Sequence, residues 1–225
     1  MTVREGADQR ERISRRQVHK FTERRDQLAR SALKTLAELG YARTSLREIA
    51  QNSPFSHGVL HYYFTDKTDL ITHCVRLYND ECVTRYDDIV AGAATAADLR
   101  GGFCGKLVET MVADAEMHRL WYDLRNQALF EPAFRSDVVD IDLSLQRMIW
   151  RVVSRYGELR GDTPVVEEEA AYAVFDGLFQ QALTRHLFGD ADAGPRLAAQ
   201  AARALDSLFG PAPIAAEGRS RPSRR

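Results

Sequence analysis

Four polar ring side chains, those of His57, His61, Tyr62 and Tyr63, lie within seven residues in a segment of helical periodicity. Imidazole and phenol groups can exchange hydrogen bonds with base edges and phosphate oxygens. Two histidines four residues apart on one helix face can also bind a metal, but no third ligand of suitable type lies nearby. We therefore favour a role in a DNA major groove, and we expect one of the two tyrosines to pack on the first helix instead.

A second group of ionisable residues, Asp114, Glu116 and His118, lies at a junction between two expected helices. These residue types can bind a metal, although an ordinary solvated helix cap is the favoured interpretation. The sequence contains no glycine-rich phosphate loop, no nucleophile elbow and no acid–base pair at a fixed spacing. We therefore expect neither catalysis nor a cofactor.

Aromatic and aliphatic side chains with a few polar neighbours recur between residues 103 and 179. Such a set is typical of a small-molecule pocket and equally of a helical core. Arg125 can pair either with an anionic ligand or with an internal carboxylate such as Asp123 or Asp176. The residues of this candidate pocket are Phe103, Leu107, Met111, Trp121, Tyr122, Arg125, Asn126, Trp150, Phe175 and Phe179.

The elements that must position these side chains are helices, because nearly every segment has helical periodicity and none of strand length alternates. Capping boxes are expected at Ser45/Glu48 and Thr95/Asp98, and Pro54 should interrupt the chain between two short helices. We predict an all-α fold of about nine helices, covering approximately 22–39, 45–51, 56–63, 66–90, 95–113, 117–128, 132–156, 163–188 and 194–208.

Charge is unevenly distributed along the 225 residues. Residues 1–70 carry 13 Lys and Arg against 9 Asp and Glu, and the remaining residues carry 18 against 23. This asymmetry suggests that the N-terminal part faces a polyanion. The expected organisation is a disordered basic arm (1–20), a helix-turn-helix domain (21–66), a ligand-binding and dimerisation domain (67–209) and a disordered basic tail (210–225).

The remaining bulk features point to the cytoplasm. The polar N-terminus has no apolar stretch of the kind found in secretory signals, and no apolar run approaches the ~20 residues of a membrane span. The three cysteines, Cys74, Cys82 and Cys104, include no close pair, which fits free thiols better than a disulfide framework. We expect a cytoplasmic protein without a membrane partner.

The segment from Arg24 to Leu70 resembles the DNA-binding domain of the TetR family of transcriptional regulators. The order and spacing of short motifs agree over this whole segment, and Phe175–Leu183 resembles the penultimate helix of many members. The shared motifs are Gly40-Tyr41, Thr44-Ser45, Ile49-Ala50, Ser56-His57-Gly58, and Phe64 with Lys67 and Leu70.

This resemblance implies which residues contact DNA. It implies that bases or the groove floor contact Arg47, His57, Gly58, Val59 and His61. It implies that phosphates contact Ser45, Tyr62, Tyr63 and Lys67. The arm residues Arg12, Arg15, Arg16 and Lys20 either follow the DNA backbone or are simply solvated. Two positions depart from the family pattern: Pro54 replaces the usual turn glycine, and His61 replaces the usual phosphate-contacting tyrosine.

The last two expected helices carry small and apolar residues suited to a two-fold helical interface. Its candidate residues are Gly177, Leu178, Ala182, Ala201, Leu205 and Leu208. With the resemblance, the sequence predicts a homodimeric repressor that binds a palindromic double-stranded operator and is released by a small, largely apolar effector enclosed in the candidate pocket. The alternative is a DNA-binding architectural or partner-recruiting protein without an effector, which a bundle without a cavity would favour.

Overall fold

The computed structural model describes residues 2–40 and 44–210, with residues 2–15 described as backbone only. Within these ranges the regular structure is helical apart from one isolated bridge, so the all-α prediction is confirmed. The helices are α1 (Thr2–Leu39), α2 (Leu46–Gln51), α3 (His57–Tyr63), α4 (Lys67–Cys82), α5 (Asp87–Gly92), α6 (Ala96–Ala113), α7 (Ala115–Gln127), the 3₁₀ turn η1 (Pro132–Phe134), α8 (Arg135–Arg160), α9 (Glu168–Leu187) and α10 (Ala193–Ser207).

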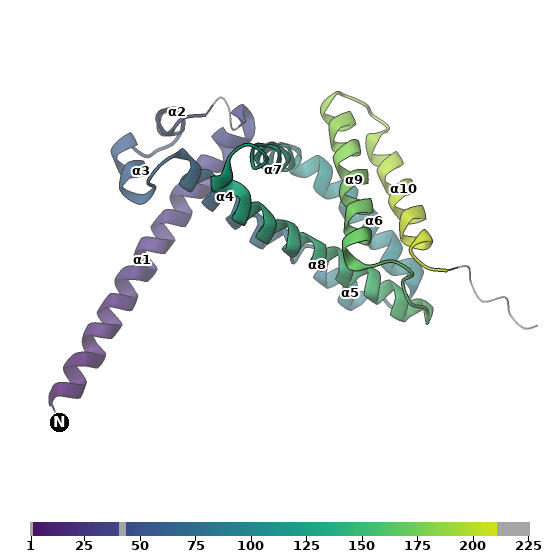
Figure 1. Cartoon of the computed structure of the whole chain (residues 1–225), viewed down its shortest axis with the longest axis horizontal. Helices are drawn as coiled ribbons and strands as arrows, with labels where there is room; N and C mark the ends of the chain where they lie inside the picture. Colours follow the sequence, from purple (N-terminus) through teal and green to yellow (C-terminus); the bar gives the residue numbers. More distant parts are fainter. Residues whose placement is uncertain (1, 41–43, 211–225) are drawn as a thin grey trace, which may run out of the picture.

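The first helix is longer than predicted. α1 begins at Thr2, whereas the sequence predicted a disordered arm over residues 1–20 and a helix from Thr22. Residues 16–20 are exposed and present no apolar stripe, so hydrophobic periodicity carries no signal there. The N-terminal part of α1 extends away from the other helices (Figure 1). The expected basic tail lies outside the described residues from position 211 onward.

The helix expected over residues 66–90 is interrupted, which is a second difference. α4 ends at Cys82, and a turn held by Arg85 N donating to Cys82 O (3.1 Å) leads into α5. This turn directs Arg85 toward Asp114, with which it forms an ion pair at 2.7 Å. A partly buried ion pair thus accompanies a bend that hydrophobic periodicity does not reveal.

The start of α9 was also predicted too early. Pro164 does not open the helix but forms a bridge with Phe209, and Val165 N donates to Leu208 O at 2.8 Å. α9 begins only at Glu168, with Glu167 in extended conformation before it. The bridge ties the end of α10 to the segment between α8 and α9.

The predicted local signals around the short helices are confirmed. Both capping boxes form, at Ser45/Glu48 and at Thr95/Asp98. Gly40, at φ 77°, ends α1 in the left-handed region that favours glycine. The turn at Pro54 needs no such residue, because no described non-glycine residue has a positive φ; instead Phe55 N donates to Ser53 Oγ at 3.3 Å.

The molecule has a three-helix head joined to a larger helical bundle. α1, α2 and α3 form the head, and α4 leads from it into the bundle of α5–α10, where α9 and α10 run side by side (Figure 1). One continuous core includes the edge-to-face pair Phe103–Phe175, whose ring centroids are 5.3 Å apart. Among the described helices, none combines the length and apolar character needed to cross a bilayer.

Candidate nucleic-acid interface and ligand cavity

α3 presents one polar, exposed face. Ser56 caps this helix by accepting from Val59 N at 3.3 Å, and Leu60 is fully buried beneath it. The opposite face carries His57, Gly58 and His61, all exposed. The His57 and His61 ring centroids are 4.4 Å apart in an edge-to-face arrangement, so the two imidazoles form a single polar surface.

The two tyrosines that end α3 have different surroundings. Tyr63 is half-buried, and its ring centroid lies 4.8 Å from that of Phe21 on α1. Tyr62 is 73% exposed and extends beyond this contact. Tyr63 is therefore the tyrosine that packs within the head, and Tyr62 is the one available to a partner. Val59, another predicted contact, is half-buried against the core.

The remaining predicted DNA contacts surround α3. Ser45 and Arg47 are exposed at the start of α2, where the Ser45 hydroxyl also accepts from Glu48 N at 3.2 Å. Lys67 is the first residue of α4 and is half-buried; burial lowers its pKa, while Glu48 and Asp123 act in the opposite direction. Of the predicted arm residues, Arg16 and Lys20 are exposed; the side chains of Arg12 and Arg15 lie outside those described.

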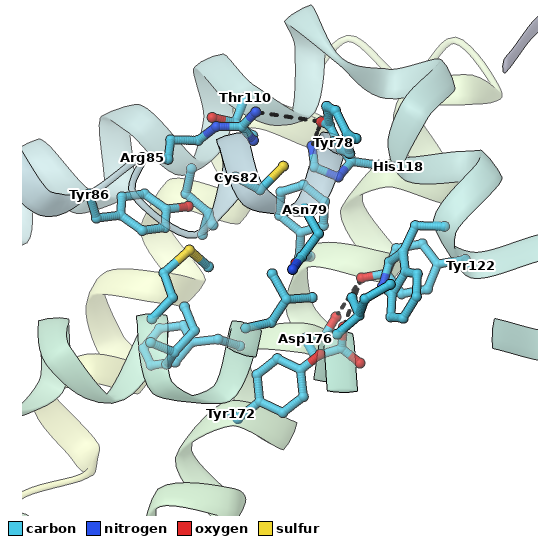
Figure 2. Close-up of a pocket in the computed structure, with 18 of the residues that line it drawn as sticks. Tyr78, Asn79, Cys82, Arg85, Tyr86, Thr110, His118, Tyr122, Tyr172 and Asp176 are labelled. Carbon is cyan, nitrogen blue, oxygen red and sulfur yellow. Dashed lines mark hydrogen bonds between the residues drawn. The ribbon is translucent and has the colours of Figure 1, made fainter. Parts of the chain in front are cut away.

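The bundle contains a cavity of about 90 Å³, bounded by α4, α6, α7, α8 and α9 (Figure 2). A single water needs roughly 10–15 Å³ by the same measure, so the space exceeds that of one isolated water. Five of the ten predicted pocket residues line it, namely Leu107, Trp121, Tyr122, Phe175 and Phe179.

The other five predicted pocket residues do not line this cavity. Phe103 and Met111 are fully buried in the core beside it, and Asn126 is exposed. Trp150 is half-buried elsewhere on α8. Arg125 belongs to an ion-pair cluster described below. These residues were chosen because they are apolar, aromatic or polar neighbours along helices of the expected bundle. Residue type and helical periodicity do not determine which positions border empty space.

Sequence reasoning also missed two walls of the cavity. α4 contributes Val75, Tyr78, Asn79 and Cys82, and the turn after it contributes Arg85 and Tyr86. α8 contributes Ile141, Leu145, Met148 and Ile149. Val75, Tyr78 and Cys82 on α4, and Ile141, Leu145 and Met148 on α8, recur every three or four residues, so helical periodicity marks them as inward-facing without showing that they border a cavity.

One polar cluster borders the cavity where α4 meets α6 and α7. Asp114 accepts from the Tyr78 hydroxyl at 3.1 Å and from Arg85 at 2.7 Å, and His118 Nε2 lies 3.4 Å from that hydroxyl. Burial, reinforced by Arg85, lowers the pKa of His118 to about 4, so the imidazole is neutral near pH 7. No group of three or more potential metal ligands occurs among the described residues.

A second polar cluster joins α7, α8 and α9. Asp176 accepts from the Tyr122 hydroxyl at 2.9 Å and from Arg125 at 2.6 Å. Asp142 accepts from the Tyr172 hydroxyl at 2.8 Å and lies 3.3 Å from Arg125 Nε. Of the two roles considered for Arg125, the structure therefore shows pairing with internal carboxylates.

α7 contacts the head as well as the cavity. His118, Trp121 and Tyr122 line the cavity, whereas Arg119 donates to the carbonyl oxygens of Ala37 and Glu38 at the end of α1. One helix therefore contacts the cavity and the head through side chains on different faces.

Four of the six residues predicted for a dimer interface are buried within the subunit. Ala182, Ala201, Leu205 and Leu208 are at most 5% exposed because α9 and α10 pack on each other and on α6. Their burial within one subunit does not support a role at a dimer interface, and the interface itself stays a prediction. Leu178 is half-buried, and Gly177 is exposed on the outer face of α9.

Comparison with known proteins places these features in a family context. Residues 28–74 match the family model described as "Bacterial regulatory proteins, tetR family". The HTH-type transcriptional repressor KstR2 of Mycobacterium tuberculosis is 27% identical over 147 residues, which cover 53% of this chain and 73% of the relative.

Two solved structures have the same fold. A TetR transcription regulator from Haloarcula marismortui is similar with a TM-score of 0.64 and 21% identity, covering 84% of this chain and 100% of that one. The transcriptional regulator FadR of Bacillus subtilis in complex with stearoyl-CoA has a TM-score of 0.64 and 17% identity, covering 82% of this chain and 97% of its own.

Proposed function

Because the chain belongs to the tetR family of bacterial regulatory proteins, we propose that it is a dimeric repressor that binds a palindromic operator and is released by a small effector. The observation that carries this proposal is the exposed polar face of α3. The side chains of His57, His61 and Tyr62 face solvent together, while Leu60 fixes the helix to the head. A short, firmly seated helix with such a face suits insertion into a major groove.

The first test asks whether the protein recognises a palindromic operator. We expect selection from a random double-stranded DNA library with the full-length protein to recover an inverted repeat, because a two-fold dimer presents two equivalent α3 helices. Enrichment of no sequence would contradict the proposal.

Lys67→Ala then tests the phosphate contacts. Lys67 begins α4, where its charge and the helix N-terminus both favour an anion. We expect weaker binding to all DNA sequences and a salt dependence reduced by roughly one unit of slope. Arg203→Ala on α10 removes an exposed positive charge far along the chain from the head and is the matched control. Equal salt slopes for both variants and the wild type would contradict the assignment.

Effector release requires a physical connection between cavity and head, and two helices supply candidates. α4 starts at Lys67 and contributes Tyr78 and Cys82 to the cavity, about 16–23 Å further along at 1.5 Å per residue. α7 lines the cavity and holds the end of α1 through Arg119. An effector that weakens operator binding tenfold needs only about 1.4 kcal/mol of preference for one conformation. The cavity favours this mechanism over a DNA-binding protein without an effector.

The dimer proposal rests on the outer face of α9 instead of the buried residues named above. This face consists of small, apolar and uncharged polar residues, which allow close approach of two helices. Val174, for example, is 41% exposed. The exposed residues of the face are Ala170, Ala173, Val174, Gly177, Gln181 and Thr184.

A further inference from the structure

We propose that the cavity selects a neutral, mostly apolar molecule that carries at least one hydrogen-bond acceptor oxygen, such as a cyclic ketone. This inference rests on the proposed effector-binding function and specifies the chemistry of the effector. Three observations support it: the charges in the wall are already paired, the buried Trp121 Nε1 and the Tyr86 hydroxyl make no hydrogen bond with a described residue, and most of the remaining lining is aromatic or aliphatic.

The charges next to the cavity are balanced within the protein. Arg85 is paired with Asp114 at 2.7 Å, and Asp176 is paired with Arg125 at 2.6 Å. Neither charged group of the lining, Arg85 or Asp176, therefore needs an ion of opposite charge from a ligand. An anion or a cation would lose its hydration on entry without gaining an unpaired partner, which disfavours both.

Two hydrogen-bond donors remain unsatisfied. Trp121 lines the cavity, is 6% exposed, and its buried Nε1 has no hydrogen-bond partner. Tyr86 is 3% exposed, its hydroxyl points toward the middle of the cavity (Figure 2), and no hydrogen bond joins that hydroxyl to another described residue. Buried donors without partners are rare, so a ligand oxygen that accepts from them gains an interaction that the empty protein lacks.

Several other polar groups of the lining already have partners within the protein. Asn79 is bonded to Ser144 at 2.9 Å, and the Tyr122 hydroxyl donates to Asp176. The remaining surface is largely ring faces and aliphatic chains, such as those of Phe175, Phe179 and Met148. A cavity of about 90 Å³ with these walls suits a compact ring more than an extended chain.

The experiment compares four six-membered-ring probes on the full-length, ¹⁵N-labelled protein. They are cyclohexanone, its isostere methylenecyclohexane without an acceptor, cyclohexanecarboxylate and cyclohexylammonium. Trp121 and Trp150 are the two tryptophans of the chain, so their indole N–H signals are assigned with Trp121→Phe and Trp150→Phe. We expect cyclohexanone to move the Trp121 signal and leave that of Trp150 in place, because Trp150 does not line the cavity.

Affinities from the same titrations decide the chemistry. Tyr86→Phe or Trp121→Phe, the latter followed through backbone amides, should weaken cyclohexanone binding about fivefold while changing methylenecyclohexane binding less than twofold. Trp150→Phe is the matched control and should change neither. Both charged probes should bind at least about tenfold more weakly than the ketone.

Three results would overturn the inference: no probe moves the Trp121 signal, neither variant distinguishes ketone from isostere, or a charged probe binds more tightly than the ketone. Operator affinity is measured separately on the same samples. If the wild-type protein does not bind an operator, the proposed repressor function is contradicted. If the wild type binds its operator but does not bind the ketone, only the assigned ligand chemistry is contradicted.

Discussion

His118 shows how much of the cavity chemistry depends on burial. Its imidazole packs on Phe179, with ring centroids 4.7 Å apart, and lies beside the Tyr78 hydroxyl. The sequence placed His118 in a cluster with Asp114 and Glu116 and favoured a solvated helix cap over a metal site. The structure instead pairs Asp114 with Arg85, which is distant from it in sequence.

The depressed pKa of His118 predicts a stability change with pH. The folded-state pKa is about 4 against an ordinary value of 6.5, so the unfolded chain binds a proton first as the pH falls below 6.5. Wild-type protein should therefore lose about 1–2 kcal/mol more unfolding free energy between pH 7 and pH 5 than His118→Gln, measured by urea denaturation. His19→Gln, at a side chain that is 73% exposed, should match the wild type. Parallel pH dependences for wild type and His118→Gln would show that the imidazole is not buried as described.

At the scale of elements, sequence signals with a local cause were reliable. Ser45, Glu48 and Gly40 marked the ends of helices because caps and left-handed glycines satisfy backbone groups nearby in sequence. The interruption after Cys82 and the late start of α9 depend on Asp114 and Phe209, which are distant in sequence, so local rules placed both wrongly.

The double contact of α7 predicts a specific local loosening. Arg119→Ala removes the donors to the carbonyls of Ala37 and Glu38, so amide hydrogen exchange at the end of α1 should accelerate and stability should fall by about 1 kcal/mol. Arg135→Ala is the control, because Arg135 donates to the Ala128 carbonyl at 3.2 Å, away from α1. If both variants affect exchange near Ala37 equally, α7 does not hold the head in the way proposed.

For the whole molecule, the sequence predicted the class of fold and the helix-turn-helix but not which surfaces remain exposed. Leu205 and Leu208 form an apolar stripe, and periodicity alone does not say whether a helix of the same chain or of a second chain covers it. Here α6 and α9 cover α10 within one subunit. Gly177 on the outer face of α9 was among the predicted interface residues, but small residues give little hydrophobic signal, so periodicity did not separate it from the buried Ala182 of the same helix.

Gly177→Glu tests that face. Open space surrounds the position at which a side chain would begin, so the substitution should leave the subunit folded while placing a charge in the proposed interface. We expect sedimentation as a monomer at micromolar concentration, with operator affinity reduced at least about tenfold because two half-sites are no longer bound together. Gly101→Glu on α6 has the same open surroundings and should remain dimeric. A dimeric Gly177→Glu protein would place the interface elsewhere.

The burial of all three thiols makes the native protein slow to react with alkylating reagents. Only the thiolate is an effective nucleophile, and burial raises the pKa of Cys82 to about 11. Alkylation must therefore await a transient opening around each sulfur. Cys74 Sγ donates to the Ala29 carbonyl at 3.2 Å between α4 and α1, Cys82 borders the cavity, and Cys104 lies on α6, which packs on α10. The alkylation rate of each cysteine therefore reports how often the structure opens locally around that sulfur. A ligand that occupies the cavity should lower the alkylation rate of Cys82.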